Sequence, residues 1–357
     1  MNKDEEIPLR KAFQLNKWSG WEENELLFSN IEHKQKGNLH LYNYGKNTLV
    51  DRNNPVIMKC RGLVVDDEGK VLNYPFERFF NDFEKEKTEI DWSTAEAQEK
   101  LDGSYIGVFW NGSDWEITTR GSFYPSENGD FDAWFRKLFD EFDLLKKNCC
   151  YMFELCTSKN RIITFYDEEF VVLIGARFLD GYYKFQEFNQ ILLDLVAKEL
   201  GVRRPKRYLI TDLNSCKKLF EELKEDDEGL VIVDDEFNRI KLKQESYIKL
   251  SKIKMLKPKD LFEYMLGRIE LDQEYIKKCP EVIKELETMK IIWEAYTKVM
   301  RKIFEEIKPL AEKSRKDFAL KAVDFKHSAW LFAMLDGKTI DKVVNYDQVK
   351  DLFEKVD

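Results

Sequence analysis

A lysine beside an Asp-Gly-Ser turn is the first place where this sequence could do chemistry. Residues 99 to 107 read EKLDGSYIG, with Lys100 directly before Leu101-Asp102-Gly103-Ser104. Taken alone, the pattern is typical of a solvated turn that leads into a strand, because Asp bonds its own backbone and Gly tolerates unusual angles. Taken as a site, it offers a lysine amine that could attack a phosphate, with Leu101 anchored inward and Gly103 allowing the bend.

Cationic residues further along the chain could complete such a site. Only a neutral lysine amine is nucleophilic, and a free lysine side chain has a pKa of about 10.4, so burial or nearby positive charge must lower it. Arg120, Lys241 and Lys243 could supply that positive field and also hold the phosphates of a nucleotide. Lys241 and Lys243 alternate with apolar residues, so we expect both to project from one face of a strand.

Three carboxylates are candidates for a magnesium site. Glu154 lies within the apolar run YMFELC, where an unpartnered carboxylate is costly. With Glu228 and Asp102 it offers oxygen ligands of the kind that Mg²⁺ takes, since this ion keeps several waters and needs few protein ligands. Taken singly, Glu154 could equally serve a structural ion pair. The sequence has no G-x-x-x-x-G-K-[ST] loop to indicate ordinary ATP hydrolysis.

Composition limits the class of protein. The 357 residues carry a net charge of -9 and are 43% hydrophobic, which indicates an ordinary globular protein of about two domains without a whole-chain basic surface for nucleic acid. The six cysteines form no Cys-x-x-Cys pair and only three histidines occur, so we expect reduced thiols and no zinc site. No signal peptide or membrane-length apolar run is present, which favours a soluble, cytoplasmic protein with no membrane partner. The sequence does not determine the oligomeric state, and a monomer is the favoured expectation.

The patterning of apolar residues changes near residue 253. Before it, many short strands are expected, with hairpins in 59–73 and 104–119, further strands at 151–156, 170–176, 229–233 and 239–242, and helical patterns at 131–145 and 185–200. After it, the pattern is helical, at 258–266, 273–307 and 328–335. In the long helix, one face is expected to carry Ile292, Tyr296, Val299, Ile303 and Ile307.

The order of the charged blocks resembles a known superfamily. The blocks are Lys-x-Asp-Gly, Arg-Gly-Ser, a strand with a central Glu, Glu-Gly-Leu-Val and Lys-x-Lys, and they resemble nucleotidyltransferase motifs I, Ia, III, IV and V of DNA ligases, RNA ligases and mRNA-capping guanylyltransferases. In finer detail the sequence is similar to the phage T4 RNA ligase 1 family, through CRGLVV followed by PFERFFN, FEL followed by NRII, and IKLKQESYIKL, in which Tyr247 takes the place of a family tyrosine. Arg78 and Arg120 stand where that family often has lysine, which changes the geometry of phosphate contacts.

The resemblance implies an α+β fold, in which a nucleotidyltransferase (ATP-grasp-like ligase) domain of antiparallel sheets with flanking helices spans 1–253 and an all-α domain spans 254–357. It also implies an ATP-dependent RNA ligase that forms a lysyl-AMP at Lys100 and then joins 5′-phosphate and 3′-hydroxyl RNA ends. Its partners would be ATP and RNA, including broken tRNA chosen through the helical domain, as in a phage-encoded repair enzyme acting in the host cytoplasm.

The resemblance assigns roles to individual residues. Lys241 and Lys243 would join Lys100 in catalysis. Mg²⁺, for which Mn²⁺ could substitute, would be held by Asp102, Glu154 and Glu228. ATP would be contacted by Tyr42, Arg61, Arg78, Glu99, Arg120, Glu154, Lys241 and Lys243.

Two alternatives remain at this point. A DNA ligase or capping enzyme shares the same blocks but usually follows them with an oligonucleotide-binding β-barrel, and the helical pattern after residue 253 weighs against both. A catalytically silent RNA-binding relative would tolerate loss of the reactive residues, all of which are present.

Overall fold

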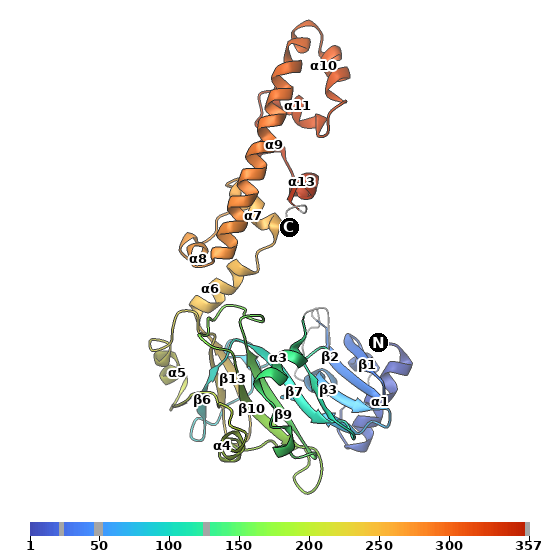
Figure 1. Ribbon diagram of the computed structural model, residues 1–357, viewed down its shortest axis with the longest axis vertical. Coiled ribbons are helices and arrows are strands. Elements are labelled where there is room, and N and C mark those ends of the chain that lie inside the picture. Colours follow the sequence, from blue (N-terminus) through green and yellow to red (C-terminus); the bar gives the residue numbers. More distant parts are fainter. Residues whose placement is uncertain (21–24, 46–52, 124–128, 354–357) are drawn as a thin grey trace. The chain divides into compact units, whose positions relative to one another are not determined.

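The computed structural model describes residues 1–20, 25–45, 53–123 and 129–353. It divides into two compact units, Met1–Tyr247 and Ile248–Asp357, a few residues from the boundary expected at 253. We call them the catalytic unit and the helical unit and describe each by itself. Among the described residues, the first holds the strands and the second consists of helices, as the α+β prediction requires (Figure 1).

The catalytic unit is built from three mostly antiparallel sheets (Figure 1). The N-terminal sheet has the order β1-β2-β3-β4, with β1 (Ile31–Lys36), β2 (Leu39–Tyr44), β3 (Arg61–Asp66) and β4 (Val71–Asn73). The central sheet has the order β10-β9-β7-β8, with β7 (Ser104–Trp110), β8 (Trp115–Thr118), β9 (Cys149–Cys156) and β10 (Phe170–Phe178). The expected hairpins at 59–73 and 104–119 are therefore β3–β4 and β7–β8.

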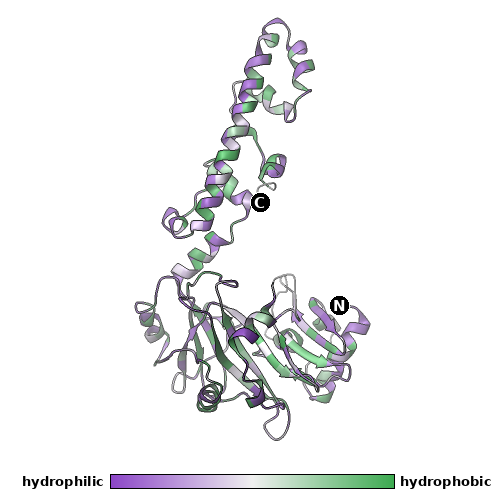
Figure 2. Ribbon diagram, in the orientation of Figure 1, coloured by the Kyte–Doolittle hydropathy of each residue, from purple (hydrophilic) through white to green (hydrophobic). Residues whose placement is uncertain are grey.

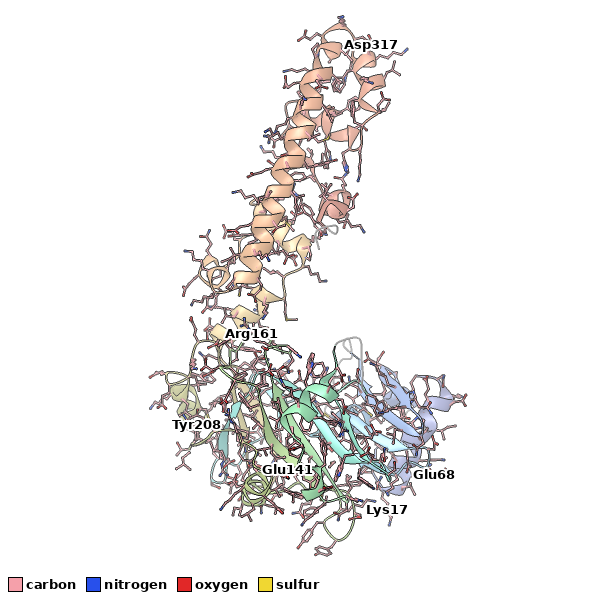
Figure 3. The ribbon with its side chains drawn as sticks, in the orientation of Figure 1. Lys17, Glu68, Glu141, Arg161, Tyr208 and Asp317 are labelled. Carbon is pink, nitrogen blue, oxygen red and sulfur yellow. The ribbon has the colours of Figure 1, made fainter. Side chains whose placement is uncertain are left out.

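The third sheet, which we call the lysine sheet, carries most of the predicted motifs. Its order is β11-β6-β12-β13-β5, with β5 (Phe80–Asn81), β6 (Glu96–Lys100), β11 (Arg207–Leu209), β12 (Gly229–Val233) and β13 (Arg239–Lys243). The edge strand β11 carries Tyr208, labelled in Figure 3. β13 lies between β12 and β5 and is not an edge strand, so its lysines belong to the interior of a sheet.

Short helices flank these sheets, and capping side chains set their starts. They are α1 (Lys3–Leu15), α2 (Pro55–Lys59), α3 (Phe131–Leu138), α4 (Gln190–Glu199) and α5 (Leu213–Leu219). Asp130 caps α3 by accepting a hydrogen bond from the N–H of Ala133. The helical pattern expected to continue to residue 145 ends at Leu138, because Phe139 takes extended backbone angles before a short 3₁₀ turn at Phe142–Leu144.

Apolar residues concentrate where sheets and helices meet, and the strands are the greenest parts of the catalytic unit in Figure 2. The central sheet packs Phe153 and Leu173 against Phe135 of α3 and Leu193 of α4. The largest hydrophobic cluster of the N-terminal sheet includes residues of α1. The hydrophobic cluster of the lysine sheet includes Cys216 of α5. All six cysteines are buried and none is paired in a disulfide among the described residues.

The helical unit is organised around one long helix. Its elements are α6 (Glu245–Lys254), which contains the boundary, α7 (Pro258–Met265), α8 (Gln273–Lys277), α9 (Pro280–Lys313), α10 (Arg315–Ala322), α11 (Ser328–Leu335), α12 (Ile340–Val343) and α13 (Tyr346–Phe353). The helix expected over 273–307 is interrupted before Pro280, because the residue preceding a proline is disfavoured in helical geometry and Cys279 has φ -117° and ψ 81°.

The buried face of α9 differs from the expected one. The structure buries Met289, Trp293, Met300, Phe304 and Ile307. Val299 was expected on this face, but 55% of its surface is exposed. Two apolar rows lie side by side on this helix, and the row with the larger side chains is the one that packs. No described helix is long and apolar enough to span a bilayer.

Candidate active site

Lys100 lies at the end of β6 in an ion-pair bridge with two other motif residues. Its Nζ is 2.8 Å from Oε2 of Glu228, and Nζ of Lys243 is 2.8 Å from Oε1 of the same carboxylate. The strand register produces this bridge, because Gly229 pairs with Lys100 on one side and with Lys243 on the other. Three residues of three separate sequence blocks thus meet at one carboxylate.

Gly229 is the position that allows Glu228 to reach both lysines. Its φ of +138° is one that side chains disfavour, and a Cβ there would lie 2.1 Å from the carbonyl oxygen of Leu242. Only glycine lets β12 approach β13 so closely. The two residues of the Glu-Gly pair therefore act together: Gly229 adopts the backbone conformation that brings β12 close to β13, and Glu228 bridges the two lysines.

The turn after Lys100 is fixed by close packing. Leu101 is buried in a small cluster with Cys156 and Val172, which confirms that it anchors the turn inward. A Cβ at Gly103 would lie 2.6 Å from the carbonyl oxygen of Leu155 and 2.9 Å from Cγ of Glu154. Gly103 is not at positive φ. The expectation that it allows a bend is therefore corrected: its role is to let β7 approach β9.

Glu154 projects from β9, a central strand, next to this turn. The pKa of Glu154 is raised to about 7, mainly by burial and also by the nearby carboxylates Glu228 and Asp102, against the lowering effect of Lys100. Carboxylates that repel one another in a half-buried site are suited to bind a cation. The cation would reduce both the repulsion between them and the energetic cost of burying their charges. Glu154 and Glu228 are the two carboxylates that fit this role, and Glu228 is at the same time ion-paired with Lys100 and Lys243.

Asp102 makes three hydrogen bonds that the sequence did not predict. Its Oδ2 accepts hydrogen bonds from the backbone N–H groups of Ile163 (2.6 Å) and Thr164 (2.7 Å), and its Oδ1 accepts one from the hydroxyl of Tyr247 (2.8 Å). Among the described residues, no group of three or more His, Cys, Asp or Glu could hold a metal ion directly. The contacts of Asp102 favour a positioning role, in which it ties the turn after Lys100 to the 163–164 loop.

Replacing Asp102 with asparagine separates these two roles. An amide cannot accept from three donors as the carboxylate does, so we expect Asp102→Asn to destabilise the protein by about 1–3 kcal/mol and lower its melting temperature. Tyr247→Phe removes only one donor and should cost about 1 kcal/mol. Thermal unfolding of both variants checks this. An unchanged melting temperature for Asp102→Asn, with a changed Mg²⁺ requirement, would instead support a metal ligand.

Three arginines from separate blocks converge on Tyr44, and we call Arg61, Arg78 and Arg120 the arginine cluster. The guanidinium carbon lies 5.1 Å from the Tyr44 ring centre for Arg78 and 5.5 Å for Arg120. Burial would raise the pKa of Tyr44, but the three arginines together lower it below its ordinary value. The Tyr44 hydroxyl therefore lies in a strongly positive field, of the kind that attracts phosphates.

Tyr44 was missed by sequence reasoning, which chose Tyr42 from the same stretch. Tyr42 has no exposed surface, and its hydroxyl donates a hydrogen bond to the backbone carbonyl of Glu5 at 2.5 Å. That environment gives Tyr42 a structural role in the N-terminal core and nothing to offer a nucleotide. Glu99, also expected at ATP, lies on β6, where burial raises its pKa and the N–H of Lys206 donates to its Oε2 at 3.3 Å.

Lys241 connects the arginine cluster to the lysine bridge. β13 buries Ile240 and Leu242 and turns Lys241 and Lys243 to the other face, which confirms the expected alternation. Burial, together with the positive charges of Arg61 and Lys100, lowers the pKa of Lys241 to about 8. Lys241 therefore carries its charge below about pH 8 and loses it above.

This titration predicts a pH dependence. We expect kcat/KM for the reaction with ATP to fall about tenfold per pH unit above pH 8, because this quantity follows the ionisation of the free enzyme and a neutral amine holds phosphate poorly. Lys241→Arg keeps its charge and should move this fall to higher pH, even if it lowers the overall rate. Initial rates from pH 6 to 10 for both proteins test this. The same alkaline fall in the variant would assign the titration to another group.

Comparison with known proteins identifies the family. The sequence profile of the RNA ligase family of T4 RNA ligase 1 type matches residues 59–248, which span the arginine cluster, the lysine bridge and Glu154. The chain belongs to the T4 RNA ligase 1 family. This RNA ligase is 27% identical to the RNA ligase of Rhodothermus phage RM378, in an alignment that covers 85% of this chain and 86% of the phage protein.

A solved structure supports the fold of this RNA ligase. An archaeal ATP-dependent RNA ligase (form 2) superposes with a TM-score of 0.50 at 13% identity, covering 75% of this chain and 77% of the other. A second structure of an archaeal ATP-dependent RNA ligase (form 1) gives 0.47 at 12% identity, covering 83% and 76%. The predicted nucleotidyltransferase ligase fold is thereby confirmed.

Proposed function

We propose that this RNA ligase uses ATP to join a 5′-phosphate RNA end to a 3′-hydroxyl end through a lysyl-AMP at Lys100. The observation that carries the proposal is the bridge in which Glu228 holds Nζ of Lys100 and Nζ of Lys243 at 2.8 Å each. It places the amine beside cations that could hold phosphates, in a turn fixed by Leu101 and Gly103.

In the first step, the lone pair of the Lys100 amine forms a bond to the α-phosphorus of ATP. The bond from that phosphorus to the bridging oxygen breaks, and its electron pair leaves with pyrophosphate. The ammonium proton of Lys100 must be lost first, and the Glu228 carboxylate, 2.8 Å away, is placed to receive it. Lys243 and Lys241 would stabilise the negative charge that develops on the phosphoryl oxygens.

In the later steps, the AMP is transferred and then expelled. A 5′-phosphate oxygen of RNA attacks the lysyl-AMP phosphorus and releases the Lys100 amine. A 3′-hydroxyl oxygen then attacks the RNA 5′-phosphorus and loses its proton to solvent. The bond from that phosphorus to the AMP oxygen breaks, AMP leaves with the electron pair, and the phosphodiester bond is formed. The arginine cluster and Lys241 would hold the phosphates of ATP and of the RNA end in turn.

We propose Mg²⁺ as the metal, held by Glu154 and Glu228 largely through water. When bound, the ion would neutralise charge on the phosphates that react. Glu154 would be the pH-sensitive ligand, since its carboxyl must lose its proton to bind a cation and its pKa is about 7.

The substrate is tested by comparing end types. We expect the protein to seal RNA with a 5′-phosphate and a 3′-hydroxyl in the presence of ATP, and to use a matched nicked DNA duplex poorly. Faster sealing of the DNA nick would contradict the RNA proposal, and labelling from GTP in preference to ATP would favour a capping-type enzyme.

We also propose that the helical unit directs the ligase to broken tRNA. Support comes from its separate compact architecture after the last catalytic motif. The full-length protein should seal a tRNA cut in its anticodon loop faster than an unstructured RNA with the same ends. Equal rates on the two would remove this part of the proposal.

A further inference from the structure

A cavity lies in the catalytic unit, and Lys100 is not among its lining residues. It has a volume of about 500 Å³, in the range of sites that enclose a small molecule or one nucleotide. Its lining residues include Phe79, Phe185, Phe237, Arg177 and Arg239. We call it the aromatic cavity.

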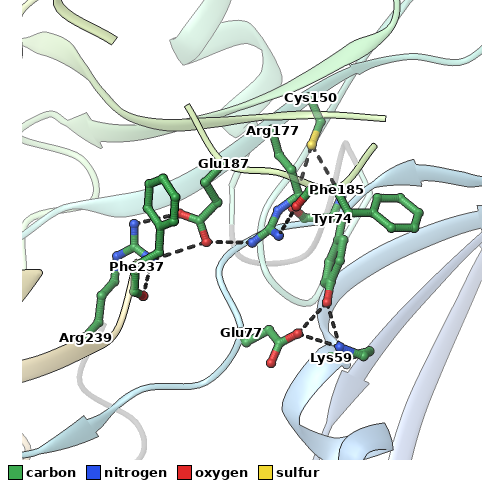
Figure 4. A network of polar contacts seen from close by, with 9 residues as sticks. All are labelled: Lys59, Tyr74, Glu77, Cys150, Arg177, Phe185, Glu187, Phe237 and Arg239. Carbon is green, nitrogen blue, oxygen red and sulfur yellow. Dashed lines mark hydrogen bonds and ion pairs between the residues drawn. The ribbon is translucent and has the colours of Figure 1, made fainter. Parts of the chain in front are cut away.

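A buried ion-pair triad forms one wall of the aromatic cavity (Figure 4). Glu187 accepts from Arg177 at 2.7 Å and from Arg239 at 2.6 Å, and each of the three side chains is only about one-tenth exposed. Nε of Arg177 is buried and has no hydrogen-bond partner among the described residues. The triad therefore holds two arginines rigidly and leaves one donor of a cavity-lining residue unpaired.

The same two arginines hold two phenylalanines in an unusual backbone conformation. Phe185 has φ +67° and Phe237 has φ +61°, a left-handed conformation that is rare for aromatic residues. The carbonyl of Phe185 accepts from Nη1 of Arg177 at 2.7 Å, and that of Phe237 accepts from Nη1 of Arg239 at 3.1 Å. Such conformations persist where surrounding contacts impose them, and they concentrate at ligand sites.

The charges of the aromatic cavity indicate the class of ligand. Its four basic lining residues are matched by four glutamates, in contrast to the arginine cluster, where three cations surround one tyrosine. A wall with balanced charge does not attract a phosphate. Aromatic faces together with fixed donors and acceptors suit a flat, neutral group with a polar edge, and an unstacked nucleobase has these properties.

The aromatic cavity also adjoins the arginine cluster. Arg78 lines the cavity, and its guanidinium lies 5.1 Å from the ring centre of Tyr44. Phe79 likewise lines the cavity, while Arg61 and Lys241 lie 5.4 Å and 5.8 Å from its ring centre. A nucleotide whose phosphate lies on the cationic side could thus extend its base to the aromatic side.

We propose that the aromatic cavity binds one unstacked base of the RNA strand whose phosphate lies on the arginine cluster. The proposal rests on the RNA-joining function given above. It makes Phe237 a residue that contacts RNA and has no part in the reaction of Lys100 with ATP.

The test uses full-length protein and a 5′-phosphorylated RNA oligonucleotide in which one nucleotide at a time is made abasic. We expect one abasic position to weaken binding to the wild-type protein about tenfold, and Phe237→Ala to weaken binding of the intact RNA by a similar factor. Phe237→Ala should then be insensitive to the abasic change at that position. Phe237→Leu, which keeps apolar volume but has no aromatic face, should resemble Phe237→Ala in binding and guards against loss of folding.

Tyr182→Ala is the matched control, since this tyrosine is 95% exposed, lies near Phe185 in the chain and does not line the cavity. It should bind the RNA like the wild type, and all three variants should form lysyl-AMP at the wild-type rate. Unchanged RNA binding by Phe237→Ala and Phe237→Leu would overturn the proposal, as would an equal loss of lysyl-AMP formation. Failure of the wild-type protein itself to seal RNA would instead overturn the proposed function.

Discussion

Replacing Lys100 with arginine is expected to abolish covalent attachment of AMP and RNA sealing from ATP, a loss of at least about 10³-fold. Arginine keeps the positive charge and can still pair with Glu228, but its guanidinium stays protonated and cannot attack phosphorus. The variant therefore removes the nucleophile and leaves the ion pair. Rates of labelling by α-labelled ATP measure the effect.

The control for this variant is Lys198→Arg, which makes the same change at an exposed position on α4. It should label like the wild type. If Lys100→Arg also labelled at the wild-type rate, another residue would be the nucleophile. If an RNA supplied already carrying AMP on its 5′-phosphate were still sealed by Lys100→Arg, the loss would be located in the first step, as the mechanism requires.

Replacing Glu228 with glutamine is expected to slow lysyl-AMP formation by about 10²-fold, a loss typical of removing one well-placed electrostatic group. The amide keeps the size of the side chain but removes the charge that holds Lys100 and Lys243 at 2.8 Å each. It also removes the group that we place to receive the Lys100 proton. Single-turnover labelling at saturating ATP isolates this step.

Glu221→Gln, at an exposed position after α5, is the control for this change and should have no effect. Glu228→Asp provides a second comparison, because it keeps the charge but is too short to bridge both lysines at the present distances. We expect it to fall between the wild type and Glu228→Gln. A wild-type rate for Glu228→Gln would show that the bridge has no part in the reaction.

Much of the site could be predicted because its residues come from ordered blocks on regular strands. The alternation in β13 correctly placed Lys241 and Lys243 on one face, and the apolar run around Glu154 correctly indicated a buried strand. Pairing between strands then brought the blocks together. Sequence alone does not give strand register, so the single carboxylate that bridges Lys100 and Lys243 was not foreseen.

The sequence could not decide whether Tyr42 or Tyr44 lies beside the arginines. Both lie on β2 two residues apart, so alternation does not distinguish them. Their environments differ because Tyr42 pairs with Leu63 in the sheet interior, whereas an irregularity in the register follows it and brings Asn43 opposite Arg61. Tyr44 therefore lies at the end of the strand, beside the arginines. How deeply a residue of a strand is buried depends on where the neighbouring strand pairs with it. The sequence of one strand does not reveal that pairing.

The hydrogen bonds of Asp102 could not be predicted for a similar reason. Next to a nucleophilic lysine, a carboxylate is a natural candidate for a metal ligand. Its donors come from residues 61, 62 and 145 positions away along the chain, namely Ile163, Thr164 and Tyr247. The local sequence around Lys100 does not predict those long-range hydrogen bonds.

The most direct test of the account is to locate the AMP on the wild-type protein. The protein is incubated with ATP labelled at the α-phosphate and Mg²⁺, denatured, digested, and its peptides are analysed by mass spectrometry. The account predicts that one peptide, the one containing Lys100, carries AMP through an acid-labile bond, and that adding 5′-phosphate RNA removes it. Absence of any AMP-bearing peptide, or AMP on Lys241 or Lys243 in its place, would contradict it.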